Sequence, residues 1–164
     1  MSRDGAGLGL KIHELLEEGL ILLDVRSPDR EGVLHELEAF IKAIRPDVAD
    51  KDIYEQLLRR ERLGSTAVRE GYAIPHCRVQ GVERAVVSLA VSKTGVHFDS
   101  VDGKPSFVFF LVVTSADHPS LNIQILAGLA QLIRKSRQLA KKILRARTGK
   151  EILEIIREEE EKLP

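Results

Sequence analysis

The chain has 164 residues with 25 basic and 25 acidic side chains, so its formal net charge is zero. This balance argues against a binder of nucleic acid or of acidic membranes. A single cysteine excludes an internal disulfide, and no apolar run approaches the roughly 18 residues of a span, which argues against direct membrane insertion. We therefore expect one cytoplasmic domain over residues 10–164, preceded by a disordered start over residues 1–9.

Apolar periodicity and turn residues predict helices and strands that alternate early, with two adjoining strands in the middle of the chain. Ser27 before a proline is typical of a helix cap, and Asp50 and Ser136 are expected to cap two later helices. The expected elements, in chain order, are an amphipathic turn or helix over 10–18, a strand over 20–25, helices over 27–45 and 51–62, short extended pieces within 68–78, strands over 84–91 and 106–114, and helices opening near 118, 136 and 150.

These elements predict an α/β fold in which a mixed sheet is flanked by helices in a single domain. The segment over 106–114 is almost continuously apolar, which favours a central strand. The residues between 99 and 105 contain Asp-Gly and a proline, which indicates a hairpin-like connection between the two adjoining strands.

The chemistry of the chain concentrates in residues 60–78, where Pro75 precedes His76. Proline restricts the backbone on both sides, so the imidazole is held at a defined angle. A histidine of ordinary pKa is largely neutral near neutral pH, so it can attack phosphorus and carry a phosphoryl group. The resulting dianion needs cations and hydrogen-bond donors, and the candidates in this segment are Arg60, Arg62, Ser65 and Thr66.

The motifs Arg60-Glu61, Gly64-Ser65-Thr66 and Ala73-Ile74-Pro75-His76-Cys77 closely resemble the signature of a known family. The family is the fructose/mannitol class of IIA domains in the bacterial phosphoenolpyruvate phosphotransferase system (PTS). The sequence Arg-Glu-Arg-Leu-Gly-Ser-Thr over residues 60–66 is most similar to the nitrogen-regulatory branch of this family. The resemblance extends over about residues 21–156. It implies that residues 10–164 form one type-2 IIA domain with a mixed sheet of about five strands. It also implies that His76 is phosphorylated by the phosphohistidine of an HPr-like carrier protein.

Two positions depart from the family pattern. The family usually carries a second histidine on the helix after the central strand, and this chain has Asn122 there. Asparagine can donate a hydrogen bond to a phosphoryl oxygen but cannot become a cation, so onward transfer is the step that this change affects. His118, at the start of that helix, is a candidate replacement. The turn over 67–71 also differs, and it adds a charge at Arg69 beside the expected docking surface.

Each candidate has a simpler structural explanation. Arg60 and Arg62 are also suited to the exposed end of a helix, Ser65 and Thr66 to turn caps, and Asn122 to a helix start. We favour Arg60 as a phosphate partner because it occupies the family position. Cys77 is expected to fill space rather than react. The histidine spacings do not indicate a metal site, and the resemblance implies no cofactor.

Three functions remain open from the sequence. The first is a phosphocarrier whose phosphorylation regulates the binding of an unknown target. The second is a sugar-uptake IIA domain that passes phosphate to a IIB domain of a permease, and the third is an interaction module without phosphate chemistry. A basic stretch over 134–147 followed by acidic residues in 151–161 indicates either two solvated helix faces or a docking patch for a partner.

Overall fold

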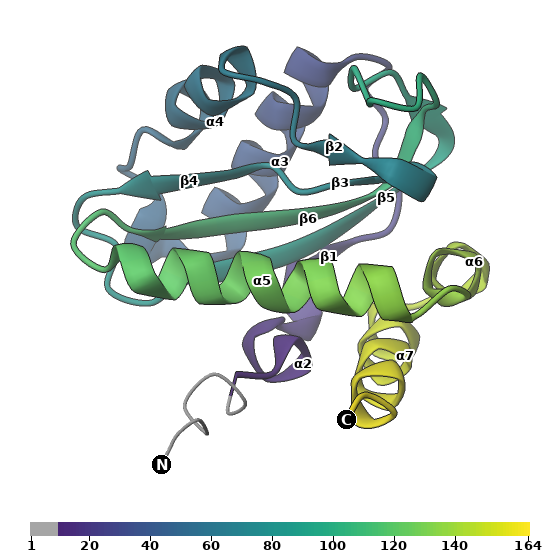
Figure 1. Cartoon of the computed structure of the whole chain (residues 1–164). Helices are drawn as coiled ribbons and strands as arrows, with labels where there is room; N and C mark the ends of the chain where they lie inside the picture. Colours follow the sequence, from purple (N-terminus) through teal and green to yellow (C-terminus); the bar gives the residue numbers. More distant parts are fainter. Residues whose placement is uncertain (1–9) are drawn as a thin grey trace.

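The computed structural model describes residues 10–164, so the expected disordered start over residues 1–9 lies outside the described part. It confirms the α/β prediction of a mixed sheet with helices on both faces (Figure 1). The strands are β1 (Ile21–Leu22), β2 (Ala67–Val68), β3 (Tyr72–Ala73), β4 (His76–Val79), β5 (Val86–Val96) and β6 (Ser106–Ser115). The α-helices are α2 (Ile12–Leu15), α3 (Arg30–Ile44), α4 (Ile53–Arg62), α5 (Pro119–Lys135), α6 (Leu139–Arg145) and α7 (Gly149–Glu161), and short 3-10 turns are η1 (Glu18–Leu20), η2 (Pro46–Val48) and η3 (Arg69–Gly71).

The sheet is organised around β6, which is buried along almost its whole length. β5 pairs antiparallel with β6 through the expected hairpin connection, and β1 pairs parallel with the far side of β5. On its other side β6 pairs in parallel with β3 and then, further along, with β4. The near-continuous apolar sequence of β6 follows from this central position, because helices cover both of its faces.

The sheet has six strands rather than about five, because its β3–β4 edge is interrupted at Pro75. Proline lacks an N–H group and restricts the preceding residue, so it breaks a strand ladder. The Pro75 carbonyl still accepts a hydrogen bond from the Val112 amide at 3.0 Å, which keeps the chain against β6. Pairing then resumes with His76 opposite Val112, so the interruption lies directly before the candidate histidine.

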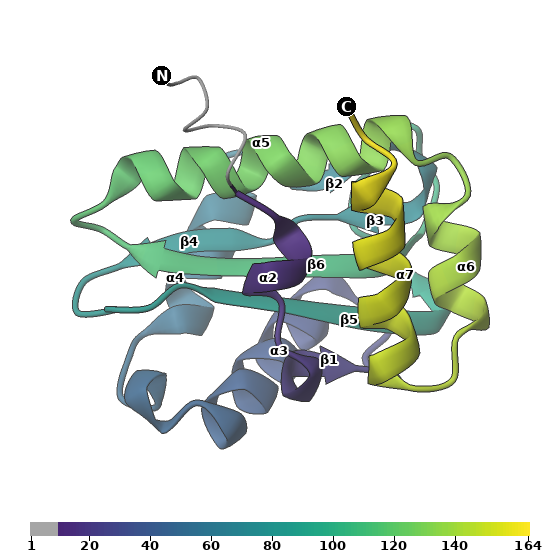
Figure 2. The same cartoon turned by 90° about the horizontal axis from the view of Figure 1, so that it is seen from below.

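Two apolar cores lie on opposite faces of the sheet. Helices α3 and α4 cover one face, and α2, α5, α6 and α7 cover the other (Figures 1 and 2). Each of these helices presents its apolar positions to the sheet, as the helical periodicity predicts. Strand β4 lies between α4 and the first turns of α5, so side chains from three elements meet there (Figure 1).

Several predicted caps are wrong by two residues. The first long helix is capped by Asp29 rather than Ser27, because the Asp29 carboxylate accepts from the Gly32 amide at 2.8 Å. The Ser27 hydroxyl instead donates to Glu36 at 2.9 Å. Helices α4 and α6 begin after Asp52 and Gln138, not after Asp50 and Ser136. The strand expected over 20–25 shortens to the two residues of β1.

Within residues 10–164, no helix is both long enough and apolar enough to span a membrane.

Candidate functional site

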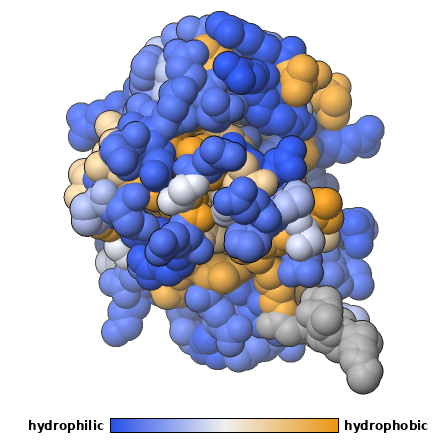
Figure 3. All heavy atoms as spheres, turned by 90° about the vertical axis from the view of Figure 1, so that its left-hand side faces the viewer, coloured by the Kyte–Doolittle hydropathy of each residue, from blue (hydrophilic) through white to orange (hydrophobic). Residues whose placement is uncertain are grey.

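A hollow of about 410 Å³ lies where β4 passes between α4 and α5. Its lining combines three arginines, the candidate histidine, a helix N-terminus and a few apolar side chains. The lining residues are Gln56, Arg59, Arg60, Leu63, His76, Cys77, Arg78, Pro119, Asn122 and Ile123. Figure 3 views the end of the molecule where β4 finishes, and hydrophilic side chains cover most of that surface with apolar ones between them.

His76 is the first residue of β4, and its ring is fixed by the backbone just before it. The Nδ1 atom lies 2.8 Å from the carbonyl oxygen of Ile74. A carbonyl oxygen only accepts hydrogen bonds, so this contact requires the proton to be on Nδ1 of the neutral ring. The lone pair is therefore on Nε2. Pro75, which lies between the two partners, makes this tautomer a consequence of the local sequence.

The environment also keeps the His76 ring neutral. Burial is the largest effect and lowers the pKa of His76 below its ordinary value of 6.5. The hydrogen bond to Ile74 opposes this shift, whereas the positive charges of Arg60 and Arg78 lower the pKa further. A neutral imidazole with a free Nε2 lone pair is the form that acts as a nucleophile.

Three arginines give the hollow a positive charge beside this nucleophile. Arg60 donates from Nη1 to the carbonyl oxygen of Gly64 at 2.8 Å, which links its guanidinium to the turn after α4. Gly64 adopts a φ angle of 149°, a backbone conformation that residues other than glycine rarely adopt. Arg59 precedes Arg60 on the helix. Arg78 lies two residues after His76, so strand alternation places both on the same face of β4.

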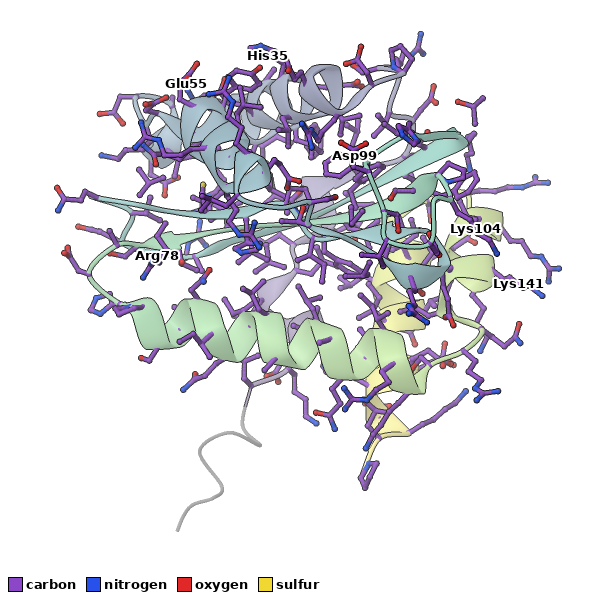
Figure 4. All side chains as sticks on the ribbon, turned by 45° about the horizontal axis from the view of Figure 1, so that its top comes forward. His35, Glu55, Arg78, Asp99, Lys104 and Lys141 are labelled. Atoms are coloured by element: carbon purple, nitrogen blue, oxygen red, sulfur yellow. The ribbon has the colours of Figure 1, made fainter. Side chains whose placement is uncertain are left out.

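Sequence reasoning missed Arg59 and Arg78. A signal for Arg78 was present, because side chains two residues apart on a strand point to the same face, and Arg78 is two residues after His76. Using this signal required knowing that a strand begins at His76, whereas the sequence predicted only short extended pieces there. Figure 4 shows Arg78 projecting from β4 near the N-terminal half of α5.

Asn122 closes the hollow from the first turns of α5 and is only 8% exposed. Its side-chain oxygen accepts from the Thr114 hydroxyl at 3.2 Å. The amide NH₂ group therefore remains as a donor for a ligand in the hollow. Pro119, the first residue of α5, also lines the hollow, so the positive end of the helix dipole adds to the arginine charge.

Ser65 and Thr66 do not line the hollow, and their side chains make other contacts. The Ser65 hydroxyl donates to the Phe98 carbonyl and accepts from the Ala67 amide at 3.0 Å. Thr66 donates from its hydroxyl and its amide to the buried carboxylate of Glu61, with the amide at 3.0 Å. These contacts correspond to the turn-cap alternative, and they tie the loop after α4 to the rest of the fold.

The other two candidates lie outside the lining. Arg62 is exposed at the end of α4, and His118 is exposed before the first residue of α5. Cys77 does touch the hollow, but its side chain is buried in the core beneath β4. Burial raises the pKa of the Cys77 thiol to about 12, so it is protonated and packs as a small apolar group. Among the described residues, no group of three or more His, Cys, Asp or Glu side chains is placed to hold a metal ion.

Comparisons with known proteins identify the family of the chain. Residues 14–159 match the family described as "Phosphoenolpyruvate-dependent sugar phosphotransferase system, EIIA 2". The nitrogen regulatory protein of Bradyrhizobium diazoefficiens is 29% identical over 147 residues, which are 90% of this chain and 95% of that protein. The fructose-specific EIIABC component of Bacillus subtilis is 30% identical over 148 residues, which are 90% of this chain but only 23% of that protein.

A solved structure shows the same fold. The crystal structure of the nitrogen regulatory protein IIA-Ntr from Neisseria meningitidis has a TM-score of 0.78 and 27% sequence identity, and the match covers 88% of this chain and 98% of that one. Because the family match spans most of the chain, the protein belongs to the EIIA 2 family of the PTS. It is therefore a IIA domain, and a phosphocarrier role is the role of this family.

Proposed function

We propose that Nε2 of His76 accepts a phosphoryl group from the phosphohistidine of an HPr-like carrier protein. The observation that carries this proposal is the hydrogen bond from Nδ1 to Ile74, which leaves the Nε2 lone pair available within a hollow that arginines line. In the transfer, the lone pair of Nε2 forms a new N–P bond while the N–P bond of the donor breaks. The donor imidazole leaves with that electron pair, and the proton of His76 stays on Nδ1, where it keeps its hydrogen bond to the Ile74 carbonyl.

The new phosphoryl group would meet several donors in the hollow. Arg60, Arg78 and the NH₂ group of Asn122 all line the hollow, and the charges of the two arginines act on the His76 ring. Charge-assisted bonds from arginine to phosphoryl oxygens are roughly twice as strong as neutral ones. In our proposal Arg60 exchanges its bond to the Gly64 carbonyl for one to the phosphoryl group, so phosphorylation also releases the turn after α4.

We infer that the output is regulatory, with the phosphorylated and unphosphorylated forms binding a target protein differently. Phosphorylation adds up to two negative charges to a positively charged hollow, which changes the surface that a partner meets. Asn122 supports this choice because it cannot supply a cation for the return of the phosphoryl group. The similarity to nitrogen regulatory proteins along nearly their whole length supports the same choice.

The second candidate is transfer of the phosphoryl group to a IIB domain during sugar uptake. The similarity to the fructose-specific component of Bacillus subtilis favours this function, although the chain spans about a quarter of that protein. Both candidates use His76 and an HPr-like donor, and they differ in the acceptor. Because phosphoenolpyruvate is an intracellular metabolite, we propose that either exchange takes place in the cytoplasm.

Intact-mass measurement tests the shared step. The purified protein is incubated with phosphoenolpyruvate, enzyme I and HPr-type carriers, and we expect a mass gain of one phosphoryl group that acid removes. His76→Ala should show no gain, whereas the matched control His118→Ala, outside the hollow, should be labelled like the wild type. Absence of any gain with every carrier would overturn the proposal and leave the interaction module. Transfer from the labelled protein to a IIB domain then separates the two outputs.

A further inference from the structure

A second recess lies at the other end of α5, against η3, β3 and α6. It consists of two adjoining hollows of about 340 and 500 Å³, both of which Glu70 and Arg134 line. We call it the α5–α6 groove, and its lining residues are Val68, Arg69, Glu70, Tyr72, Ile74, Ala130, Ile133, Arg134, Arg137, Ala140 and Lys141. Figure 4 shows Lys141 at the opposite end of the molecule from Arg78, and the groove shares no lining residue with the His76 hollow.

The groove is strongly positive although the chain as a whole is neutral. Arg69, Arg134, Arg137 and Lys141 are exposed, and within residues 10–164 none of them has an ion pair or a side-chain hydrogen bond. Glu70 is the acid in the lining, so four cations face one carboxylate. The neighbouring Lys142, in contrast, pairs with Glu159 at 2.9 Å. Lys142 therefore has an acidic partner on α7, whereas the structure of residues 10–164 gives the four cations of the groove none.

The floor of the groove is apolar. One of its two hollows is lined mainly by Val68, Ile74, Ala130 and Ile133. Ala130 is exposed, and the three branched side chains lie at the edge of the core beneath α5. A ligand that fits both parts has an apolar side for the floor and carboxylates for the arginines, because arginine pairs with carboxylates through two parallel hydrogen bonds.

Other polyanions fit the groove less well. Tyr72 is the aromatic residue in the lining, and it is only 2% exposed, so single-stranded nucleic acid finds no stacking platform. The apolar residues line a recess, whereas a membrane-binding surface needs apolar side chains that protrude into the lipid. An acidic amphipathic helix of a protein partner has both an apolar side for the floor and carboxylates for the arginines.

We propose that the α5–α6 groove binds an acidic amphipathic helix of the protein that this domain regulates. The apolar side of that helix packs on Ala130 and Ile133, and its carboxylates pair with Arg134 and Arg137. This inference rests on the proposed regulatory function, but the docking site is separate from the phosphorylation site. The two are therefore tested by different measurements.

Fluorescence anisotropy with a labelled synthetic peptide tests the proposal. The probe is a helical peptide with a leucine face and a glutamate face, and the control peptide carries lysine in place of glutamate. We expect the acidic peptide to bind the full-length protein more tightly than its control, with an affinity that falls as salt rises. Binding of the two peptides with equal affinity would overturn the proposal.

Charge reversal locates the binding site. The double variant Arg134→Glu with Arg137→Glu should weaken binding of the acidic peptide by about tenfold or more. The matched control, Arg145→Glu with Arg147→Glu, makes the same charge change in the same basic stretch but outside the lining, and it should keep the affinity within about twofold. Equal losses in both double variants would show a diffuse charge effect and contradict a defined groove.

A second variant tests the apolar floor. Ala130→Glu adds a carboxylate at an exposed helix position, so the fold should survive, and the acidic peptide should bind about tenfold or more weakly. Gln124→Glu adds the same charge elsewhere on α5 and serves as the control. Vesicles of phosphatidylglycerol and phosphatidylcholine provide the opposing test, because binding of vesicles without binding of the peptide would assign the groove to lipid. Phosphorylation of His76 in the same variants should be unchanged, which separates failure of the groove from failure of the phosphocarrier function.

Discussion

The His76 hollow and the α5–α6 groove both contain arginines and both border α5, but these arginines surround different groups. In the hollow, Arg60 and Arg78 stand beside an imidazole whose tautomer the backbone fixes. In the groove, Arg134 and Arg137 stand beside an apolar floor without a nucleophile. The comparison teaches that arginine clusters acquire their role from their neighbours. A fixed lone pair favours phosphoryl chemistry, and an apolar floor favours docking.

The largest expected effect separates these two arginine pairs. Arg60→Ala with Arg78→Ala should slow phosphorylation about a hundredfold, because each lost charge-assisted bond costs about 1.4 kcal/mol or tenfold in rate. Arg60→Ala alone should slow it at least about tenfold. The matched double variant in the groove, Arg134→Ala with Arg137→Ala, should keep the wild-type rate. Quench-flow labelling by the phosphorylated carrier measures the rate of all three variants. Equal slowing in the two double variants would contradict a phosphoryl-binding role that is specific to Arg60 and Arg78.

A somewhat smaller effect is expected from the support beneath the hollow. Glu61 is buried at the end of α4 and accepts both the amide and the hydroxyl of Thr66. Glu61→Ala leaves these donors unpaired and should lower the free energy of unfolding by about 1–3 kcal/mol. Glu55→Ala, at an exposed position of the same helix, should change it by less than about 0.5 kcal/mol. Urea unfolding measures both, and similar values for the two variants would contradict the anchoring role.

The same carboxyl predicts a pH dependence of stability. Burial raises the pKa of Glu61 above its ordinary value, and the bonds from Thr66 only partly oppose that shift. The folded state therefore binds this proton more tightly than the unfolded state, so stability falls as the pH rises from the ordinary pKa of a glutamate through the raised one. Glu61→Gln should reduce this decline. A decline as steep in Glu61→Gln as in the wild type would assign it to other groups.

A change of about 1 kcal/mol is expected at Asn122. Asn122→His restores the residue that the family usually carries, and a protonated imidazole should stabilise the phosphoryl oxygens in the transition state of transfer by about 1 kcal/mol more than a neutral amide does. Onward transfer to a IIB domain should therefore accelerate roughly fivefold. The control is His118→Ala with Asn122 retained. An unchanged rate in Asn122→His, together with a slower rate in His118→Ala, would show that His118 already compensates.

The smallest expected effect is a shift in the pH profile of phosphorylation. The pKa of His76 is lowered below 6.5. As the pH falls, the rate of phosphorylation should therefore stay constant to below pH 6.5 and decrease only when the ring becomes protonated. Arg78→Gln removes one of the charges that lower this pKa, so the midpoint should move to higher pH. Arg134→Gln in the groove should leave it in place. A midpoint at or above 6.5 in the wild type would contradict the effect of burial.

Much of the fold could be predicted from local sequence. The apolar run of β6 and the periodic helices α5 and α7 were recognisable because each follows one simple pattern. The two-residue strands were not, because their pairing partners β5 and β6 lie far along the chain. The caps were not either, because several neighbouring polar side chains could accept the free amides. The Ser27 hydroxyl, for example, donates to Glu36, and Asp29 caps the helix instead.

The candidate site shows the same division. His76 and Arg60 could be named from a local motif, and the structure brings both to the hollow. Ser65 and Thr66 belong to that motif too, but their hydroxyls donate to Phe98 and Glu61, and the motif alone could not separate this role in the loop from contact with a phosphoryl group. Arg78 was missed because its direction depends on where β4 begins, and that start is set by pairing with β6.

The most direct test of the central claim is to identify the phosphorylated nitrogen. The protein is labelled with ¹⁵N-histidine, phosphorylated by the carrier and observed by ³¹P and ¹⁵N NMR. The account predicts one phosphoryl group on Nε2 of His76, with the proton of the ring still on Nδ1. A phosphoryl group on Nδ1, or on a residue other than His76, would contradict the role that the Ile74 hydrogen bond gives to this histidine.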